Sequence, residues 1–164
     1  MSERAWIRGA QRGSVADLER LFREHWPRAY RAAQLVTGDA AAAEDIAQEA
    51  FLAAVRALDR FDLRRPFGPW LHRIAVNRAI DWARASKLRA EQEQRDVPAP
   101  ERADPDDRML PALASLDPDH RAVIVLRYLL EYTPGEIAEL LDLPRGTVNS
   151  RLRRGLDKLK ERLE

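Results

Sequence analysis

Apolar residues recur every three or four positions along most of this chain, which is the spacing of an amphipathic α-helix. In residues 40–58, for example, Ile46, Ala50, Phe51 and Leu58 fall on one side. The run Val123-Ile124-Val125 is too short and too embedded in helical spacing to be a strand. The same spacing predicts helices over residues 4–12, 14–36, 70–88, 118–130, 134–141 and 144–163. The predicted fold class is therefore all-α.

Prolines interrupt this pattern in two places. Pro27 lies inside the helix expected over residues 14–36, where a proline costs about 3 kcal/mol. Because the apolar stripe resumes after it, we expect a kink rather than an end. Residues 60–69 (RFDLRRPFGP) contain Pro66, Gly68 and Pro69. These punctuating residues predict an irregular loop before the next helix.

The C-terminal stretch 133–163 has the pattern of two helices joined by a tight turn. Thr133 and Glu136 have the spacing of a capping box around Pro134, and Asp142-Leu143-Pro144 ends the first helix. Polar and basic residues face away from the apolar side of the second helix. They are Asn149, Ser150, Arg153 and Arg154. This arrangement is typical of a helix-turn-helix that enters a DNA major groove.

Composition narrows the function class. The chain has 164 residues, no cysteine and three histidines without metal-ligand spacing. It therefore cannot form disulfides or zinc–thiolate sites, and a reducing cytoplasm suits it. We find no membrane-spanning apolar run, no signal core, no nucleophile elbow and no Gly-rich phosphate loop. We expect a cytoplasmic protein that is not an enzyme, binds no cofactor or metal and does not insert into a membrane.

Charge is balanced overall but unevenly distributed. The net charge is +1, with +4 in residues 1–87, −4 in residues 88–133 and +1 in residues 134–164. An autonomous DNA-binding protein is usually clearly basic, because phosphate contacts dominate its affinity. This balance favours a subunit that a larger partner delivers to DNA.

Three stretches resemble one protein family. EIAELLDLPRGTVNSRLRRGLDKLKERL resembles region 4 of the extracytoplasmic-function (ECF) sigma factors of the sigma-70 family, AEDIAQEAFLAAVRAL resembles region 2.2, and RFDLRRPFGPWLHRIAVNRAIDWARA resembles regions 2.3 and 2.4. Their pairing in this order is more specific than either match alone. The resemblance implies a non-catalytic subunit that binds core RNA polymerase and directs it to promoters. It implies region 2 over residues 1–88, a flexible acidic linker over 89–107 and region 4 over 108–164.

The resemblance also assigns protein partners. Asp45, Gln48 and Glu49 would dock on the β′ coiled coil of core polymerase, whose β subunit is a further expected partner. Charge-assisted hydrogen bonds there would fix register more than affinity. Sigma factors of this class are often held by an anti-sigma factor, so one is expected. Within the linker, the acidic residues would act in polymerase channels as a mimic of nucleic acid. They are Glu91, Glu93, Asp104, Asp106 and Asp107.

Promoter contacts follow from the same motifs. For the −10 element, Phe61 and Asn77 match the family's positions near a flipped base. The plausible phosphate contacts are Arg64, Arg65, Arg73 and Arg84. For the −35 element, the family's base- and phosphate-contacting positions are matched by Asn149, Ser150, Arg153 and Arg154. The residues close enough to touch the DNA backbone are Arg145, Thr147 and Arg151. Helically spaced aromatics usually pack, so Phe67, Trp70 and Trp82 are expected in the core.

Two residues depart from the region 4 pattern. Asp142 stands in the turn where the family usually has Gly, although Asp tolerates a left-handed backbone less well. Gly155 lies inside the second helix, where it costs about 1 kcal/mol relative to Ala. One alternative function remains open: a stand-alone helix-turn-helix regulator that binds a duplex operator as a dimer without polymerase. The near-zero charge and the basic helix after residue 69 argue against it.

Overall fold

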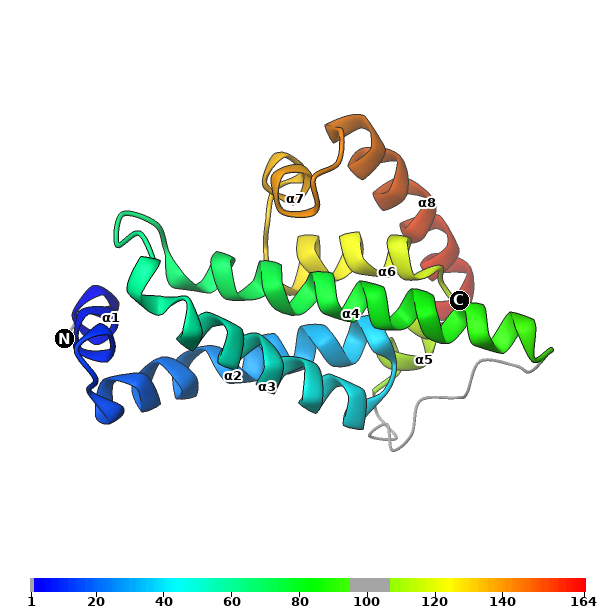
Figure 1. Cartoon of the computed structure of the whole chain (residues 1–164). Helices are drawn as coiled ribbons and strands as arrows, with labels where there is room; N and C mark the ends of the chain where they lie inside the picture. Colours follow the sequence, from blue (N-terminus) through cyan, green and yellow to red (C-terminus); the bar gives the residue numbers. More distant parts are fainter. Residues whose placement is uncertain (1, 95–106) are drawn as a thin grey trace.

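The computed structural model describes residues 2–94 and 107–164, and these residues form helices joined by short turns (Figure 1). No strand occurs in these two ranges, which confirms the all-α class. Most of the acidic linker, residues 95–106, lies outside the described part of the chain, and so do Asp104 and Asp106.

The N-terminal half contains four α-helices and one short 3-10 helix. They are α1 (Glu3–Gln11), α2 (Val15–Thr37), α3 (Ala40–Arg56), η1 (Leu58–Arg60) and α4 (Phe67–Gln92). The C-terminal half contains shorter elements, including one turn of π-helix named η2. They are α5 (Met109–Ala114), α6 (Pro118–Ile124), η2 (Val125–Leu129), α7 (Pro134–Leu141) and α8 (Arg145–Leu163).

Local sequence signals begin and end several of these helices. The side chains of Ser14 and Asp39 accept hydrogen bonds from backbone N–H groups three residues later, at the starts of α2 and α3. Thr133 and Glu136 form the expected capping box at the start of α7. Gly38 ends α2 with φ 70°, a left-handed conformation that glycine adopts without steric cost.

Pro27 behaves as expected, but the prolines before α4 do not. Helix α2 runs through Pro27 without ending. The prediction of an irregular loop up to residue 69 was wrong, because α4 begins at Phe67 and contains Pro69 in its first turn. The first N–H groups of a helix have no intrahelical acceptor, so a proline there removes no hydrogen bond. Helix α4 also extends through Gln92, four residues beyond the expected end.

The two halves pack against each other through a shared apolar core. Val36 from α2 and Val76 from α4 belong to the same buried cluster as Leu113, Leu126 and Ile137 from the C-terminal half. A second cluster lies wholly within the N-terminal half, around Leu21, Phe51 and Leu71. Long α4 lies between α2 and α3 on one side and α6 on the other, and α7 and α8 lie beyond α6 (Figure 1). The arrangement is one packed body rather than two separate bundles.

Buried polar groups tie the halves together at two points. The guanidinium of Arg121 in α6 donates hydrogen bonds to the carbonyl oxygens of Val36 and Leu116. Burial lowers the pKa of Arg121 to about 10. Nδ1 of His72 in α4 and the Tyr132 hydroxyl are joined by a hydrogen bond of 2.8 Å. Both contacts link residues far apart in sequence. Polar as well as apolar contacts therefore fix how the two halves pack together.

Gly155 has a packing role that explains its position inside α8. A Cβ atom added there would lie 2.7 Å from Cδ1 of Ile124 and 3.5 Å from Cβ of His120. Helix α8 therefore crosses α6 so closely that a side chain at this position would require the end of the Ile124 side chain to move. The conformational cost of glycine is offset by this close packing.

Candidate polymerase and nucleic-acid interfaces

An acidic and amide face of α3 is exposed. Asp45, Gln48 and Glu49 all lie on the solvent side of this helix, and Ile46 and Ala50 are buried on the other side. Glu49 accepts a hydrogen bond of 2.9 Å from Arg78 of α4, which holds its carboxylate in place. The three predicted polymerase-contacting residues thus share one accessible surface.

Sequence reasoning missed an apolar extension of this surface. Leu52 is 54% exposed and Val55 is 39% exposed on the same helix. Leu52 lies three and four positions after Glu49 and Gln48, so the three side chains are neighbours on the helix surface. Nothing in the sequence indicated that Leu52 is exposed beside Gln48 and Glu49, because helical spacing alone does not show whether an apolar residue is buried.

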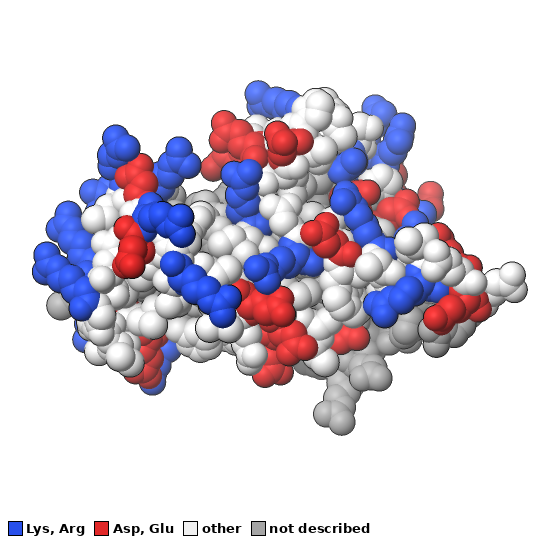
Figure 2. All heavy atoms as spheres, viewed as in Figure 1, with Lys and Arg blue, Asp and Glu red and all other residues white. Residues whose placement is uncertain are grey.

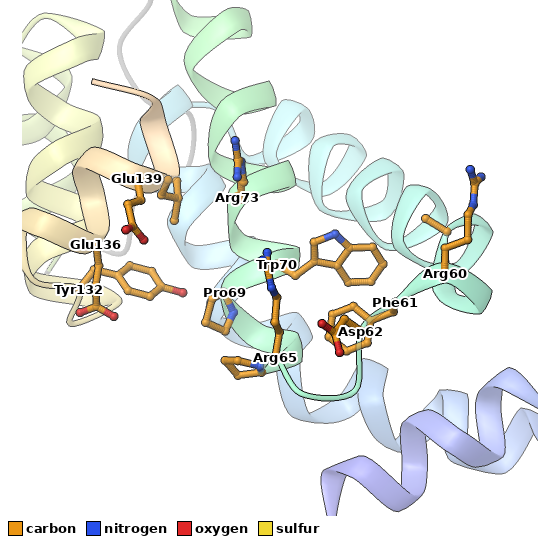
Figure 3. Close-up of a pocket in the computed structure, with 13 residues that line it drawn as sticks. Arg60, Phe61, Asp62, Arg65, Pro69, Trp70, Arg73, Tyr132, Glu136 and Glu139 are labelled. Atoms are coloured by element: carbon orange, nitrogen blue, oxygen red, sulfur yellow. The ribbon is translucent and has the colours of Figure 1, made fainter. Parts of the chain in front are cut away.

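A groove lies between the start of α4 and α7, with a volume of about 920 Å³. Its N-terminal wall includes Phe61, Arg65, Trp70 and Arg73. The Phe61 ring centroid lies 4.6 Å from that of Trp70 and 5.9 Å from that of Phe67. Figure 3 shows Phe61 and Trp70 side by side in this wall. Aromatic rings beside arginines form a surface suited to unstacked bases and phosphates.

Trp70 is half-buried: as expected it packs against the N-terminal core cluster, and it also lines the groove beside the loop that carries Phe61. Phe67, by contrast, is 3% exposed, so the prediction of a core residue is confirmed there. Trp82 is partly buried and packs against the shared core.

The residues predicted to contact the −10 element do not all lie together. Phe61, Arg65 and Arg73 line the groove. Half-buried Asn77 follows one helical turn after Arg73. Arg84 lies further along α4, outside the groove, and pairs with Asp119 of α6.

Arg64 lies in the exposed turn beside the groove. Its side chain donates to both carboxylate oxygens of Asp62, with one contact at 3.0 Å. This hydrogen bonding lowers the pKa of Asp62 and raises that of Arg64. Arg64 is almost fully exposed and Asp62 is partly exposed, so the pair is weak and a phosphate can replace the carboxylate at little cost.

The opposite wall of the groove comes from the C-terminal half. Tyr132, Glu136, Glu139 and Leu140 line it, and Figure 3 shows the two glutamates on the far side from Phe61. This acidic wall narrows access to the aromatic pair. No sequence signal indicated it, because the two walls are at least 59 residues apart.

Helix α8 presents the predicted −35 residues on its outer side. Val148, Leu152, Gly155 and Leu159 are buried against the rest of the protein. The remaining positions face away from this buried side. Asn149, Arg145, Arg153 and Arg154 are exposed, and Ser150, Thr147 and Arg151 are half-buried. The helix-turn-helix geometry is therefore present, with Asp142 in its turn at φ 55° and ψ 52°.

Surface charge follows these elements. In Figure 2 basic side chains gather at the end of the molecule formed by α1 and the turn before α4, and others lie along α8. Red and blue atoms are interspersed over the middle of the view. Within the described residues, no group of three or more His, Cys, Asp or Glu side chains could hold a metal ion. None of the helices in those residues is long and apolar enough to cross a membrane.

Comparison with known proteins decides the family. The model named Sigma-70 region 2 matches residues 21–89, and the model named Sigma-70, region 4 matches residues 112–161. The chain is 33% identical to the ECF RNA polymerase sigma factor SigW of Bacillus subtilis, over 96% of this chain and 92% of SigW. The chain belongs to the ECF sigma factors. This ECF sigma factor is also 36% identical to SigL of Mycobacterium tuberculosis, over 90% of this chain and 89% of SigL.

Solved structures show the same fold. The ECF sigma factor described here matches CnrH in complex with the cytosolic domain of CnrY, with a TM-score of 0.73 and 29% identity over 98% of this chain and 96% of CnrH. It also matches RpoE of Bartonella quintana, with a TM-score of 0.71 and 22% identity over 91% of this chain and 98% of RpoE. The matches cover both halves in one arrangement, so the compact fold is shared with these proteins.

Proposed function

We propose that this ECF sigma factor binds core RNA polymerase and directs it to promoters, with region 4 reading the −35 element and region 2 capturing the melted −10 strand. The observation that carries this proposal is the presence of regions 2 and 4, in that order, in one chain. We assign region 2 to residues 1–88 and region 4 to 108–164. The structure supports the proposal by exposing a distinct surface for each partner.

Polymerase would dock on the exposed face of α3. The carboxylates of Asp45 and Glu49 and the amide of Gln48 offer acceptors for basic groups on the β′ coiled coil. Exposed Leu52 adds apolar area at one end of the same face, next to Gln48 and Glu49. Apolar contact combined with polar contact is common in protein interfaces.

Region 2 would act by capturing a strand, without hydrolysing anything. Unstacking a base costs a few kcal/mol, and stacking on an aromatic side chain returns about 1–3 kcal/mol per base. Phe61 and Trp70 supply adjoining rings, and Arg65 and Arg73 supply charges in the same groove. Asn77 would contribute an amide to a base edge.

Region 4 would place α8 in the major groove at the −35 element. Arg153 and Arg154 reach outward from the helix, beside Asn149. An arginine that donates two hydrogen bonds to guanine contributes about 1–3 kcal/mol of discrimination. The half-buried Arg151 and Thr147 lie at the edge of this surface, where they can meet the DNA backbone.

A protein inhibitor is a further expected partner. CnrH, which has the same fold at 29% identity, was solved in complex with the cytosolic domain of CnrY, and RpoE of Bartonella quintana was solved in complex with the anti-sigma factor NepR. We therefore infer that an anti-sigma factor binds this chain as well, across the packed arrangement of regions 2 and 4.

Run-off transcription with core polymerase on a library of promoter sequences tests the proposal directly. We expect transcripts that depend on added sigma factor and share a common pair of upstream elements. A gel-shift assay with the protein alone is the matched control. Tight, specific duplex binding without polymerase, together with no transcription, would favour the stand-alone regulator instead.

A further inference from the structure

The contact between α4 and α6 pairs basic residues of region 2 with acidic residues of the C-terminal half. Arg84 donates to Asp119, with its Nε 3.0 Å from the carboxylate, and Lys87 donates to Asp117. Hydrogen bonding to Asp117 raises the pKa of Lys87, and the same bond lowers the pKa of Asp117. The Lys87–Asp117 pair is therefore fully charged near neutral pH.

One carboxylate serves both DNA-binding regions. The Oδ1 atom of Asp119 that binds Arg84 also lies 4.0 Å from Nη1 of Arg151 in α8. Arg84 is a proposed −10 phosphate contact and Arg151 a proposed −35 backbone contact. Arginine side chains bind carboxylates and phosphates with the same donor geometry, so a carboxylate between two guanidinium groups can compete with a phosphate.

Asp117 shows that this arrangement is specific. It stands at the N-cap position of α6, yet its side chain makes no capping hydrogen bond. A cap contributes about 1 kcal/mol to a helix. The carboxylate instead reaches across to Lys87, so the local helix signal is overridden by the contact between the halves.

The ion pairs that cross between the halves all have the same polarity. Among the described residues, two more ion pairs cross between the halves: Arg28 with Glu131 at 3.9 Å and Arg31 with Asp107 at 2.8 Å. In each pair the cation belongs to region 2 and the anion to the C-terminal half. Four cations of residues 1–87 thus meet four carboxylates of residues 107–131 across this contact.

We infer that Asp117 and Asp119 act as an internal phosphate mimic, which occupies Arg84, Lys87 and Arg151 while the two halves are packed together. DNA phosphates and these carboxylates compete for the same cations. The pairs are partly exposed, so each is weak and can be exchanged for a phosphate once polymerase separates the halves. This inference rests on the proposed promoter contacts of Arg84 and Arg151.

The double variant Asp117→Asn, Asp119→Asn tests the inference, because asparagine keeps the shape and removes the charge. We would measure binding of the full chain to a single-stranded oligonucleotide at several salt concentrations. Freeing Arg84 and Lys87 adds two phosphate contacts, so the slope of log K against log salt should steepen by about 1.4, at about 0.7 per contact. Affinity at low salt should rise about tenfold.

A matched control removes the same charge elsewhere. Asp157→Asn, Glu161→Gln neutralises two exposed carboxylates of α8 that form no ion pair with region 2 within the described residues. This control should raise affinity less and leave the salt slope nearly unchanged. Equal salt slopes for the wild type, the Asp117→Asn, Asp119→Asn variant and the control would overturn the inference.

Run-off transcription separates this outcome from failure of the proposed function. If the wild type initiates from promoters but the salt slope of the Asp117→Asn, Asp119→Asn variant is unchanged, the phosphate mimic is refuted and the sigma function stands. If the slope steepens while the wild type directs no transcription, the mimic is supported and the promoter assignment fails.

Discussion

The buried imidazole of His72 should make this protein sensitive to acid. Its side chain is 5% exposed, and its hydrogen-bond partner is the neutral hydroxyl of Tyr132. Burial, together with the charges of His25 and Arg28, lowers the pKa of His72 from 6.5 to about 4. The site therefore accepts a neutral ring, because a protonated one would lose hydration without gaining an acidic partner.

The sign of the effect follows from the direction of this pKa shift. On acidification the unfolded chain takes up a proton at His72 before the folded chain does. The stability that depends on a neutral His72 is complete above pH 6.5 and is lost as the pH falls toward 4. The loss between about pH 8 and pH 4.5 amounts to about 2.5 kcal/mol. That is a large fraction of the 5–15 kcal/mol that is typical of a native protein.

Urea unfolding across this pH range, followed by circular dichroism, measures the effect. The control is His72→Gln, whose amide can bond to the Tyr132 hydroxyl but does not titrate. The wild type should lose about 2.5 kcal/mol more than the variant between about pH 8 and pH 4.5. Parallel stability curves for the two proteins would refute the reasoning.

Five further variants test packing, backbone conformation and promoter contacts. Gly155→Ala should lower stability by about 1–3 kcal/mol despite a better helix propensity, because the added methyl meets Ile124; thermal unfolding would show a lower Tm. Asp142→Gly should raise stability by about 1 kcal/mol in the same assay, by removing strain at φ 55°. Arg154→Ala should reduce promoter-specific transcription about tenfold or more, whereas Arg162→Ala, a neighbouring exposed arginine, should not. Phe61→Ala should slow open-complex formation, seen by permanganate footprinting, with core binding unchanged; Asn77→Ala should do the same.

Each of these predictions has an outcome that would contradict it. A neutral or stabilising Gly155→Ala would contradict the close crossing of α6 and α8. A destabilising Asp142→Gly would show that the aspartate side chain contributes more than its backbone strain costs. Full activity of Arg154→Ala on the same promoter, or normal strand opening by Phe61→Ala, would contradict the residue assignments without affecting family membership.

Local signals predicted the helices well and failed where position within a helix mattered. The periodicity of residues 40–58 and the capping box at Thr133 both predicted the observed elements. The failure at residues 67–69 arose because a proline breaks a helix only where its N–H is needed, and the first turn does not need it. The groove beside Trp70 was missed because helical spacing shows which side a residue faces, but not whether a groove lies on that side.

The sequence by itself determined the helical class, the presence of regions 2 and 4 in that order, the outward polar face of α8 and the acidic face of α3. Each of these features depends on residues within a few turns of one another. Only the tertiary structure decided that Tyr132 meets His72, that α7 walls the groove around Phe61 and that Asp119 binds Arg84. These contacts join residues 35 to 78 positions apart and depend on how two amphipathic units fit together. The free energy of these contacts comes from close packing and desolvation at the interface between the two units. Neither can be predicted from the spacing of apolar residues along the chain.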